Sequence, residues 1–207
     1  MKKSFDFVMD NLIENYPIDV ITDIFNSFKI NVVYVLREIK SKKDFNDEFI
    51  VPSSPSKNVI YKRAFLLKDP TIYHLYKGND LILVESKSLK NNTYISTNKK
   101  INFLKDPISD KLSFDEQNAR SCLHNKIKVV FNFNLLRCNH FRNQSIKQTL
   151  FITNILKEHK VDMIFASFAK TTTDLVPRDI LFCMLKNYIF EESLINRVLD
   201  KDILKNE

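Results

Sequence analysis

Short apolar runs alternate with longer amphipathic stretches along most of the chain. The runs are rich in β-branched and aromatic residues. Several are apolar at every position, which is typical of strands that are covered on both faces of a parallel sheet. They predict eight strands, over residues 4–8, 31–36, 59–67, 80–85, 93–97, 101–104, 128–133 and 162–167.

Helix signals lie between most of these runs. Pro17 and Pro177 each stand at the start of an amphipathic stretch, where proline is favoured. Ser113 is followed three residues later by Glu116, which is a capping-box pattern. With the apolar spacing of each stretch, these signals predict helices over 17–28, 113–123, 142–159, 177–188 and 191–199.

The alternation of strands and helices predicts the α/β class. Eight strands suggest a small (βα)8 TIM-barrel-like fold in which several helices are reduced, and a smaller open α/β sheet is the alternative. The chain has 207 residues, without an internal repeat or a low-complexity linker. We therefore expect a single domain over residues 1–207.

Composition excludes some functions and favours others. The net charge of +7 and the sequence pI of about 9.2 favour nucleic acid or another anionic partner. The single glycine, Gly78, excludes a glycine-rich phosphate loop. Three cysteines without a CxxC pair indicate neither a disulfide framework nor a zinc site. The sequence shows no signal peptide and no apolar run long enough to cross a membrane.

Residues that could bind metal are sparse. The four histidines stand at 74, 124, 140 and 159, and none is paired with another histidine or a carboxylate at ligand spacing. Each is more simply a surface or packing histidine. Two charges lie inside otherwise apolar strands, namely Asp6 and Arg63. Because buried charges need partners, we expect Asp6 and Arg63 to form a structural charge pair, and the alternative is that one of them reaches a ligand.

The strongest functional signal is basic. Arg137 and Arg142 follow one predicted strand, and Lys170 and Arg178 follow the next. Because the turns after parallel strands share one face of the sheet, these four side chains can converge on phosphate groups of RNA. The alternative is an ordinary solvated, charged surface.

Residues 128–199 carry a resemblance to one family. The strand VVFNFNLL is followed by Arg137 and, after four intervening residues, by Arg142 and a long helix. MIFASFAK and TTTDLVPRDI come next, with Pro177 and Asp179 opening another helix. This order is similar to the thirty-kilodalton-class protein subunit of nuclear ribonuclease P and ribonuclease MRP. The N-terminal half agrees more loosely, and departures at Val130, Val176, Asn102 and Phe168 indicate a divergent, compact member.

The resemblance implies a barrel like that of polymerase-and-histidinol-phosphatase proteins, without their metal-binding histidines. It implies a non-catalytic, RNA-binding subunit in the nucleus, acting in tRNA 5′-leader processing. The partners would be ribonuclease P RNA, a small ferredoxin-like subunit and other ribonuclease P proteins, with pre-tRNA reached indirectly. Mg²⁺ would be bound by the RNA, and this chain would bind no cofactor. The rivals are a metal-dependent phosphoesterase on a related barrel and a basic scaffold protein without RNA affinity.

Overall fold

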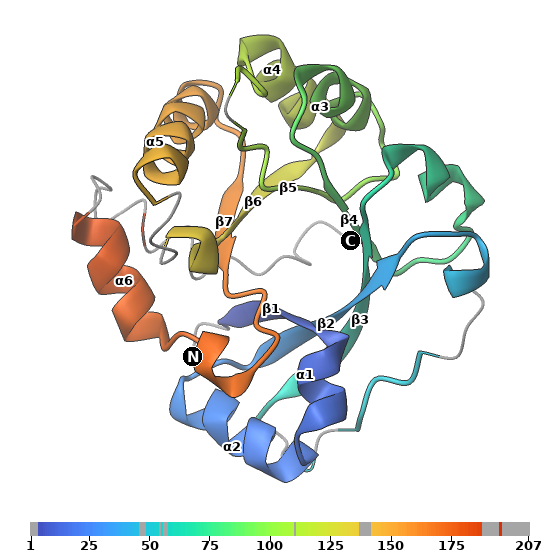
Figure 1. Cartoon of the computed structure of the whole chain (residues 1–207), viewed down its shortest axis with the longest axis vertical. Helices are drawn as coiled ribbons and strands as arrows, with labels where there is room; N and C mark the ends of the chain where they lie inside the picture. Colours follow the sequence, from blue (N-terminus) through green and yellow to red (C-terminus); the bar gives the residue numbers. More distant parts are fainter. Residues whose placement is uncertain are drawn as a thin grey trace. The chain divides into compact units, whose positions relative to one another are not determined.

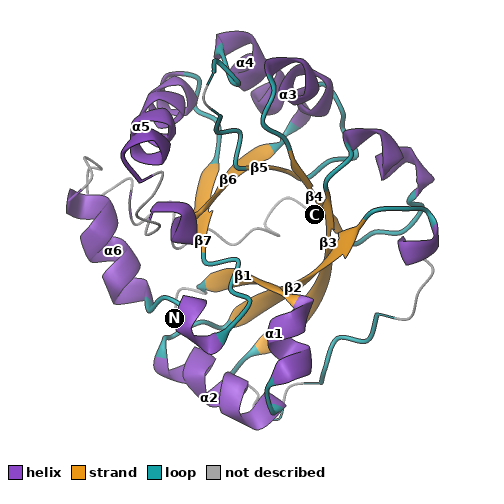
Figure 2. Cartoon of the chain, in the orientation of Figure 1, coloured by secondary structure: helices purple, strands orange, loops and turns teal. Residues whose placement is uncertain are grey.

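The fold was analysed in a computed structural model, which describes residues 4–45, 49–53, 55, 58–109, 111–136, 142–187 and 195. Seven strands alternate with helices along these residues (Figures 1 and 2). The strands are β1 (Phe5–Met9), β2 (Val32–Ile39), β3 (Ile60–Leu67), β4 (Leu81–Glu85), β5 (Phe103–Lys105), β6 (Lys128–Asn132) and β7 (Met163–Ala166). They form one sheet in which each strand lies beside the next in chain order, β1 to β7.

The α-helices are α1 (Asp10–Asn15), α2 (Ile18–Ser27), α3 (Leu89–Ser96), α4 (Glu116–Asn125), α5 (Arg142–Glu158) and α6 (Arg178–Asn187). Short 3₁₀ turns occupy Lys43–Phe45, Pro70–Leu75, Phe133–Leu136 and Thr172–Asp174. No helix in the described ranges combines the length and the apolar character that a bilayer crossing needs.

The chain divides into two compact units. Unit 1 comprises residues 1–36, 50–63 and 165–207, and unit 2 comprises residues 37–49 and 64–164. The expectation of a single domain stays a prediction.

Unit 1 is built on β1 and β2, which pair in parallel from Phe5 opposite Val32 to Met9 opposite Leu36. The segment after β7 also lies parallel to β1, where Val8 bridges to Ala169 and the Met9 amide donates to the Ala169 carbonyl. Pairing of the first strand with the segment after the last is a property of TIM-barrel-like folds and not of open sheets.

Unit 2 contains the parallel ladder from the second half of β3 to β6. Its strands are buried along nearly their whole length, as in Leu81–Val84 and Phe103–Lys105, because helices cover the sheet. Helix α3 packs against α4 and β5, and α4 packs against α5. The burial explains why these strands read as continuous apolar runs in the sequence.

The predicted α/β, TIM-barrel-like class is confirmed by the parallel strand order, with three differences in detail. Residues 93–97 were expected to form a strand, but residues 93–96 are the last four of α3 and Thr97 is its C-cap. The first turn of α3 is capped by the Ser88 hydroxyl. Helix α4 is capped by Asp115, not Ser113, because the Asp115 carboxylate accepts from the Asn118 amide. Helix α1 was not expected at all. The predicted helix over 191–199 lies outside the described residues except for Ile195.

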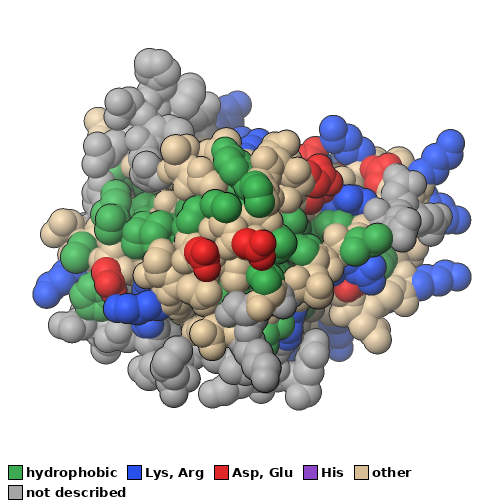
Figure 3. Space-filling model, turned by 90° about the horizontal axis from the view of Figure 1, so that it is seen from below, with side chains coloured by type: hydrophobic (Ala, Val, Ile, Leu, Met, Phe, Trp, Pro, Cys, Tyr) green, Lys and Arg blue, Asp and Glu red, His purple; other side chains and the backbone are tan. Residues whose placement is uncertain are grey.

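Apolar side chains are not all buried. Val20 of α2 is 48% exposed, and Figure 3 shows hydrophobic side chains between charged ones on one face of the molecule. Scattered apolar exposure of this kind is normal for folded proteins. Phenylalanine serves mainly as core filling, since Phe7, Phe25, Phe103 and Phe131 are almost fully buried.

Candidate functional site

The structure describes only part of the predicted basic patch. Arg137 lies outside the described residues, and of Arg142 only the backbone is described, as the first residue of α5 in unit 2. Lys170 and Arg178 belong to unit 1, where Lys170 is exposed and Arg178 begins α6. Convergence of all four on one RNA-binding face therefore stays a prediction.

The loop that carries Lys170 has a defined backbone. The Asp174 carboxylate accepts hydrogen bonds from the Lys170 amide at 3.1 Å, the Thr171 amide at 3.0 Å and the Thr171 hydroxyl at 2.9 Å. This capping arrangement fixes the main chain of the loop. It leaves the Lys170 ammonium group exposed to solvent.

Asp6 is buried in β1 and accepts hydrogen bonds from Ser167, which lies 161 residues later in the sequence. The Ser167 amide donates to Asp6 Oδ1 at 2.7 Å, and the Ser167 hydroxyl donates to Asp6 Oδ2 at 2.5 Å. The Phe7 amide also donates to Oδ1, at 2.9 Å. Burial raises the pKa of Asp6 to about 6, although the hydrogen bonds from Ser167 and Phe7 oppose the rise.

Arg63 differs from Asp6 in its environment. Its side chain is exposed in β3, whereas that of Asp6 is only 3% exposed. The expectation of two buried charges is therefore wrong for Arg63, because this part of β3 faces solvent. The contacts found for Asp6 come from Ser167 and Phe7, and the Asp6–Arg63 pair itself stays a prediction.

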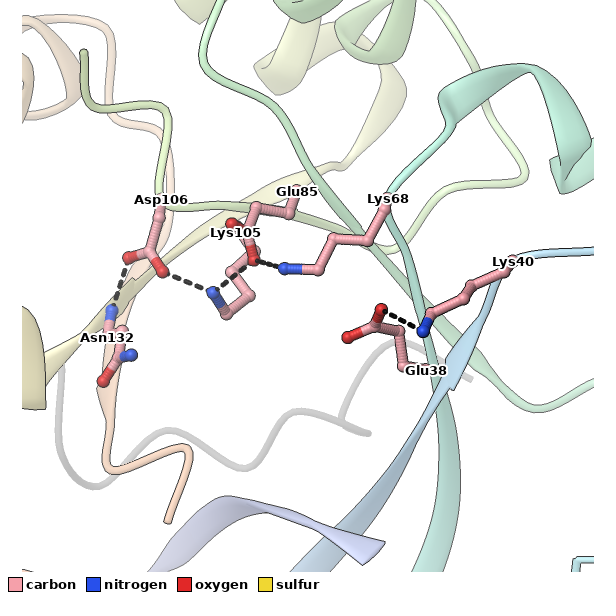
Figure 4. A network of polar contacts seen from close by, with 7 residues as sticks. All are labelled: Glu38, Lys40, Lys68, Glu85, Lys105, Asp106 and Asn132. Carbon is pink, nitrogen blue, oxygen red and sulfur yellow. Dashed lines mark hydrogen bonds and ion pairs between the residues drawn. The ribbon is translucent and has the colours of Figure 1, made fainter. Parts of the chain in front are cut away.

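A polar network lies at the carboxyl ends of β3, β4 and β5 in unit 2 (Figure 4). Lys68 directly follows β3, and its Nζ lies 2.6 Å from Glu85 Oε2 at the end of β4. The Nζ of Lys105, at the end of β5, lies 2.8 Å from the same oxygen and 2.5 Å from Asp106 Oδ2. The other oxygen of Asp106 accepts from the Asn132 amide at 2.6 Å. Functional sites of α/β barrels are placed at these strand ends.

Burial makes the network electrostatically strong. The side chains of Lys105 and Asp106 are 7% and 2% exposed. Burial raises the pKa of Glu85, but the charge of Lys105 and the hydrogen bonds from Lys105 and Lys68 outweigh it and lower the pKa to about 2. Burial lowers the pKa of Lys105, but the charges of Asp106 and Glu85 outweigh burial and raise it. Both shifts favour the charged forms of Glu85 and Lys105.

The backbone at Asp106 is strained in support of this network. Its φ of 46° lies in the left-handed region, which residues other than glycine adopt at a cost. The conformation lets the Asp106 amide donate to the Val130 carbonyl at 2.9 Å while its carboxylate contacts both Lys105 and Asn132. Such strain persists only where surrounding contacts hold it in place.

The arrangement neutralises charge and does not offer a free acid or base. Both carboxylates are engaged by Lys105, and among these four side chains Lys68 is the most exposed, at 44%. A second ion pair, between Lys40 and Glu38 at 3.7 Å, lies at the end of β2 (Figure 4). Among the described residues no three His, Cys, Asp or Glu side chains form a group that could hold a metal ion.

The sequence interpretation missed this network, although a signal was present. The charged members stand at the ends of apolar runs. Lys68 follows the run at 65–67, Glu85 follows the run at 81–84, and Lys105 and Asp106 follow Leu104. Charges that repeat at strand ends are informative only after the strand ends are known. The basic residues predicted from the sequence, Arg137, Arg142, Lys170 and Arg178, instead follow β6 and β7.

Comparison with known proteins gives a fold likeness only. No family model matches the chain, and no curated protein matches it. A chain of the cryo-EM structure of archaeal ribonuclease P with mature tRNA has a TM-score of 0.72 at 13% identity, covering 94% of this chain and 86% of that chain. An amidohydrolase, and a prolidase complexed with N-methylphosphonate-L-proline, each have a TM-score of 0.54 at 9% identity, covering 96% of this chain and 72% of theirs.

Proposed function

We propose that this chain is a protein subunit of ribonuclease P that binds and stabilises the catalytic RNA. The observation that carries the proposal is the fold likeness to a chain of archaeal ribonuclease P, which extends over nearly the full length of both chains. The match to the amidohydrolase and the prolidase covers a smaller share of their chains, 72%, and its TM-scores are lower. The net charge of +7 suits a partner of RNA.

The strand ends of unit 2 support a non-catalytic role. A hydrolase on this kind of fold uses carboxylates at the strand ends to hold metal or to transfer protons. Here Glu85 and Asp106 are both bound to Lys105, so that using either carboxylate to bind metal or to transfer a proton would break a buried ion pair. The network therefore fits a structural role better than that of a metal-dependent phosphoesterase.

The finer parts of the proposal rest on the sequence resemblance. They are location in the nucleus, a share in ribonuclease MRP, and assembly with a small ferredoxin-like subunit and other ribonuclease P proteins. Arg137, Arg142, Lys170 and Arg178 would contact RNA phosphates, and pre-tRNA would be reached through the RNA. The Mg²⁺ used in cleavage would be bound by that RNA.

Copurification tests the proposal. The tagged chain is isolated under native conditions from the cells that express it, and the bound RNA is sequenced. We expect one structured noncoding RNA to be enriched, together with an activity that removes the 5′ leader of pre-tRNA and is lost after nuclease treatment. The same isolation from cells without the tag is the control.

Two other results would each replace the proposal. Chelator-sensitive phosphoester hydrolysis by the purified chain, resistant to nuclease treatment, would establish the metal-dependent phosphoesterase. Isolation of protein partners without any enriched RNA would establish the basic scaffold.

A further inference from the structure

Four turns that lead from a helix into a strand share one sequence pattern, which was not apparent as a repeat in the sequence. Each has a lysine, a β-branched apolar residue, a polar or charged residue and then an apolar strand residue. The four segments are KINV at 29–32, KINF at 100–103, KIKV at 126–129 and KVDM at 160–163. They precede β2, β5, β6 and β7.

The backbone explains part of this pattern. After α4, the Lys126 amide donates to the Leu123 carbonyl at 3.2 Å and the Ile127 amide donates to the Cys122 carbonyl at 2.8 Å. These two bonds form a Schellman motif, in which an apolar residue such as Ile127, 1% exposed, packs under the helix end. The repeated β-branched residue is therefore required by the core.

The lysine is not required in the same way. Lys126 has a φ of 59°, and Lys160, in the equivalent turn after α5, has a φ of 56°. Glycine or asparagine fits this left-handed position better than lysine does. Asparagine is frequent elsewhere in the chain, yet both turns use lysine. The backbone conformation of the two turns therefore does not explain the choice of lysine.

Interaction with the helix dipole accounts for only part of the preference. A cation near the carboxyl end of a helix is stabilising, but the effect is confined to the last turn. Lys99 and Lys100 lie three and four residues beyond the end of α3 at Ser96, and neither has a left-handed backbone. The lysine thus recurs where the dipole does not reach.

Three of these turns lie side by side in unit 2. The Lys128 amide donates to the Asn102 carbonyl at 3.0 Å, and the Val129 amide donates to the Asp162 carbonyl at 3.0 Å. The starts of β5, β6 and β7 are therefore adjacent. The lysines at 100, 126 and 160 each stand two residues before one of these positions. They therefore precede the amino ends of neighbouring strands, and such strands lie roughly 5 Å apart.

The charge of this surface is mainly positive. Lys99, Lys100, Lys126 and Lys160, here called the amino-end lysines, are all exposed, and no ion pair involves them among the described residues. The neighbouring acids are Glu158, which is exposed, Asp162, which is half-buried, and Glu116, which is exposed and lies 3.8 Å from His159. In unit 1, by contrast, Lys29 of the segment at 29–32 forms an ion pair, in which its Nζ lies 3.6 Å from Asp179 Oδ2.

We propose that the amino-end lysines bind the phosphate backbone of RNA, at the opposite ends of the strands from the Glu85–Lys105 network. The inference deepens the proposed function and rests on it. Exposed ammonium groups on adjacent turns suit contact with successive phosphates, without reading the base sequence.

Two double variants of the full chain test the inference. Lys126→Gly with Lys160→Gly removes two amino-end charges, and Lys111→Ala with Lys147→Ala removes two exposed charges away from these turns. Binding to a transcribed tRNA is measured between 50 and 200 mM salt. Loss of two phosphate contacts should make the negative slope of log affinity against log salt shallower by roughly 1.4–1.8. The affinity at 0.1 M salt should fall roughly 25- to 60-fold.

The test variant, Lys126→Gly with Lys160→Gly, should lose affinity for tRNA but gain stability. Its melting temperature should rise, because glycine fits both left-handed turns. If the glycine variant does not fold, Lys126→Asn with Lys160→Asn keeps a residue suited to the turns and should lose the same affinity.

Equal losses in the test and control variants would overturn the inference, because binding would follow net charge. Unchanged binding by the test variant, or no binding by the wild-type chain, would overturn it as well. Copurification with pre-tRNA cleavage judges the proposed function separately. The chain can copurify with a pre-tRNA-cleaving RNA even if the glycine variant binds tRNA as well as wild type does. Conversely, the glycine variant can lose tRNA binding even if no such RNA copurifies.

Discussion

Replacement of Asp6 by asparagine should change the pH dependence of stability, because Asp6 is a buried carboxyl group with a raised pKa. Asparagine keeps the geometry, because its Oδ1 can accept from the Phe7 and Ser167 amides as the carboxylate does. Its amide nitrogen can donate to the Ser167 hydroxyl, which now donates to the carboxylate. The substitution therefore removes the charge and retains the three hydrogen bonds.

The magnitude follows from the raised pKa of Asp6. The pKa rises from 3.8 to about 6, and each unit corresponds to about 1.4 kcal/mol. The folded protein thus holds the proton more tightly than the unfolded chain. The stability that the neutral carboxyl group contributes is fully present below pH 3.8 and is lost as the pH rises to about 6. The loss amounts to about 3 kcal/mol.

Urea unfolding of wild type and Asp6→Asn at several pH values from 4 to 7 is the assay. The two proteins should differ little at pH 4, and Asp6→Asn should become more stable by up to about 3 kcal/mol at pH 7. Ser167→Ala is the companion variant, and it should cost more stability at pH 7 than at pH 4 because the ionised carboxylate loses a donor. A difference between wild type and Asp6→Asn that does not vary with pH would refute the reasoning.

Three further predictions concern other charged groups. Lys105→Met should lower the free energy of unfolding by about 3–5 kcal/mol, measured in urea, because Glu85 would be left buried with a weaker counter-charge. Arg137→Ala with Arg142→Ala should weaken RNA binding and flatten its salt dependence while the melting temperature barely moves. Arg63→Ala should lower the melting temperature only slightly, since the Arg63 side chain is exposed. If Arg63→Ala instead lowers the melting temperature strongly in wild type but not in the Asp6→Asn variant, the predicted pair would be established.

Sequence periodicity was sufficient for most of the fold because most elements are either fully buried or clearly amphipathic. The seven observed strands coincide with seven of the predicted runs. The failure at 93–97 has a local cause. The run TYIST is rich in β-branched residues, but Ser88 caps a helix that begins before it, and Ile95 and Asn92 pack inward from one helical face. Tertiary packing outweighs the intrinsic strand preference there.

The candidate site was less predictable because its chemistry depends on partners that are distant in the sequence. Lys105 is neutralised by Glu85, 20 residues earlier, and Asp6 is held by Ser167, 161 residues later. The amino-end lysines became visible only when the strand starts were known, since the turns themselves lie 26 and 34 residues apart in the sequence (100 to 126, 126 to 160).

Asp6 and Glu85 show why a charge in an apolar strand cannot be interpreted by itself. Both are acids in strands that read as apolar, and burial raises the pKa of both. Glu85 has two lysines within 3 Å, so its pKa falls to about 2 and its stabilising effect is lost only as the pH falls below 4.5. Asp6 is held by hydrogen bonds from Ser167 and Phe7, which burial outweighs, so the stability that its neutral form contributes is lost as the pH rises. The same residue pattern therefore gives opposite pH dependence, and the nearest cation decides the sign.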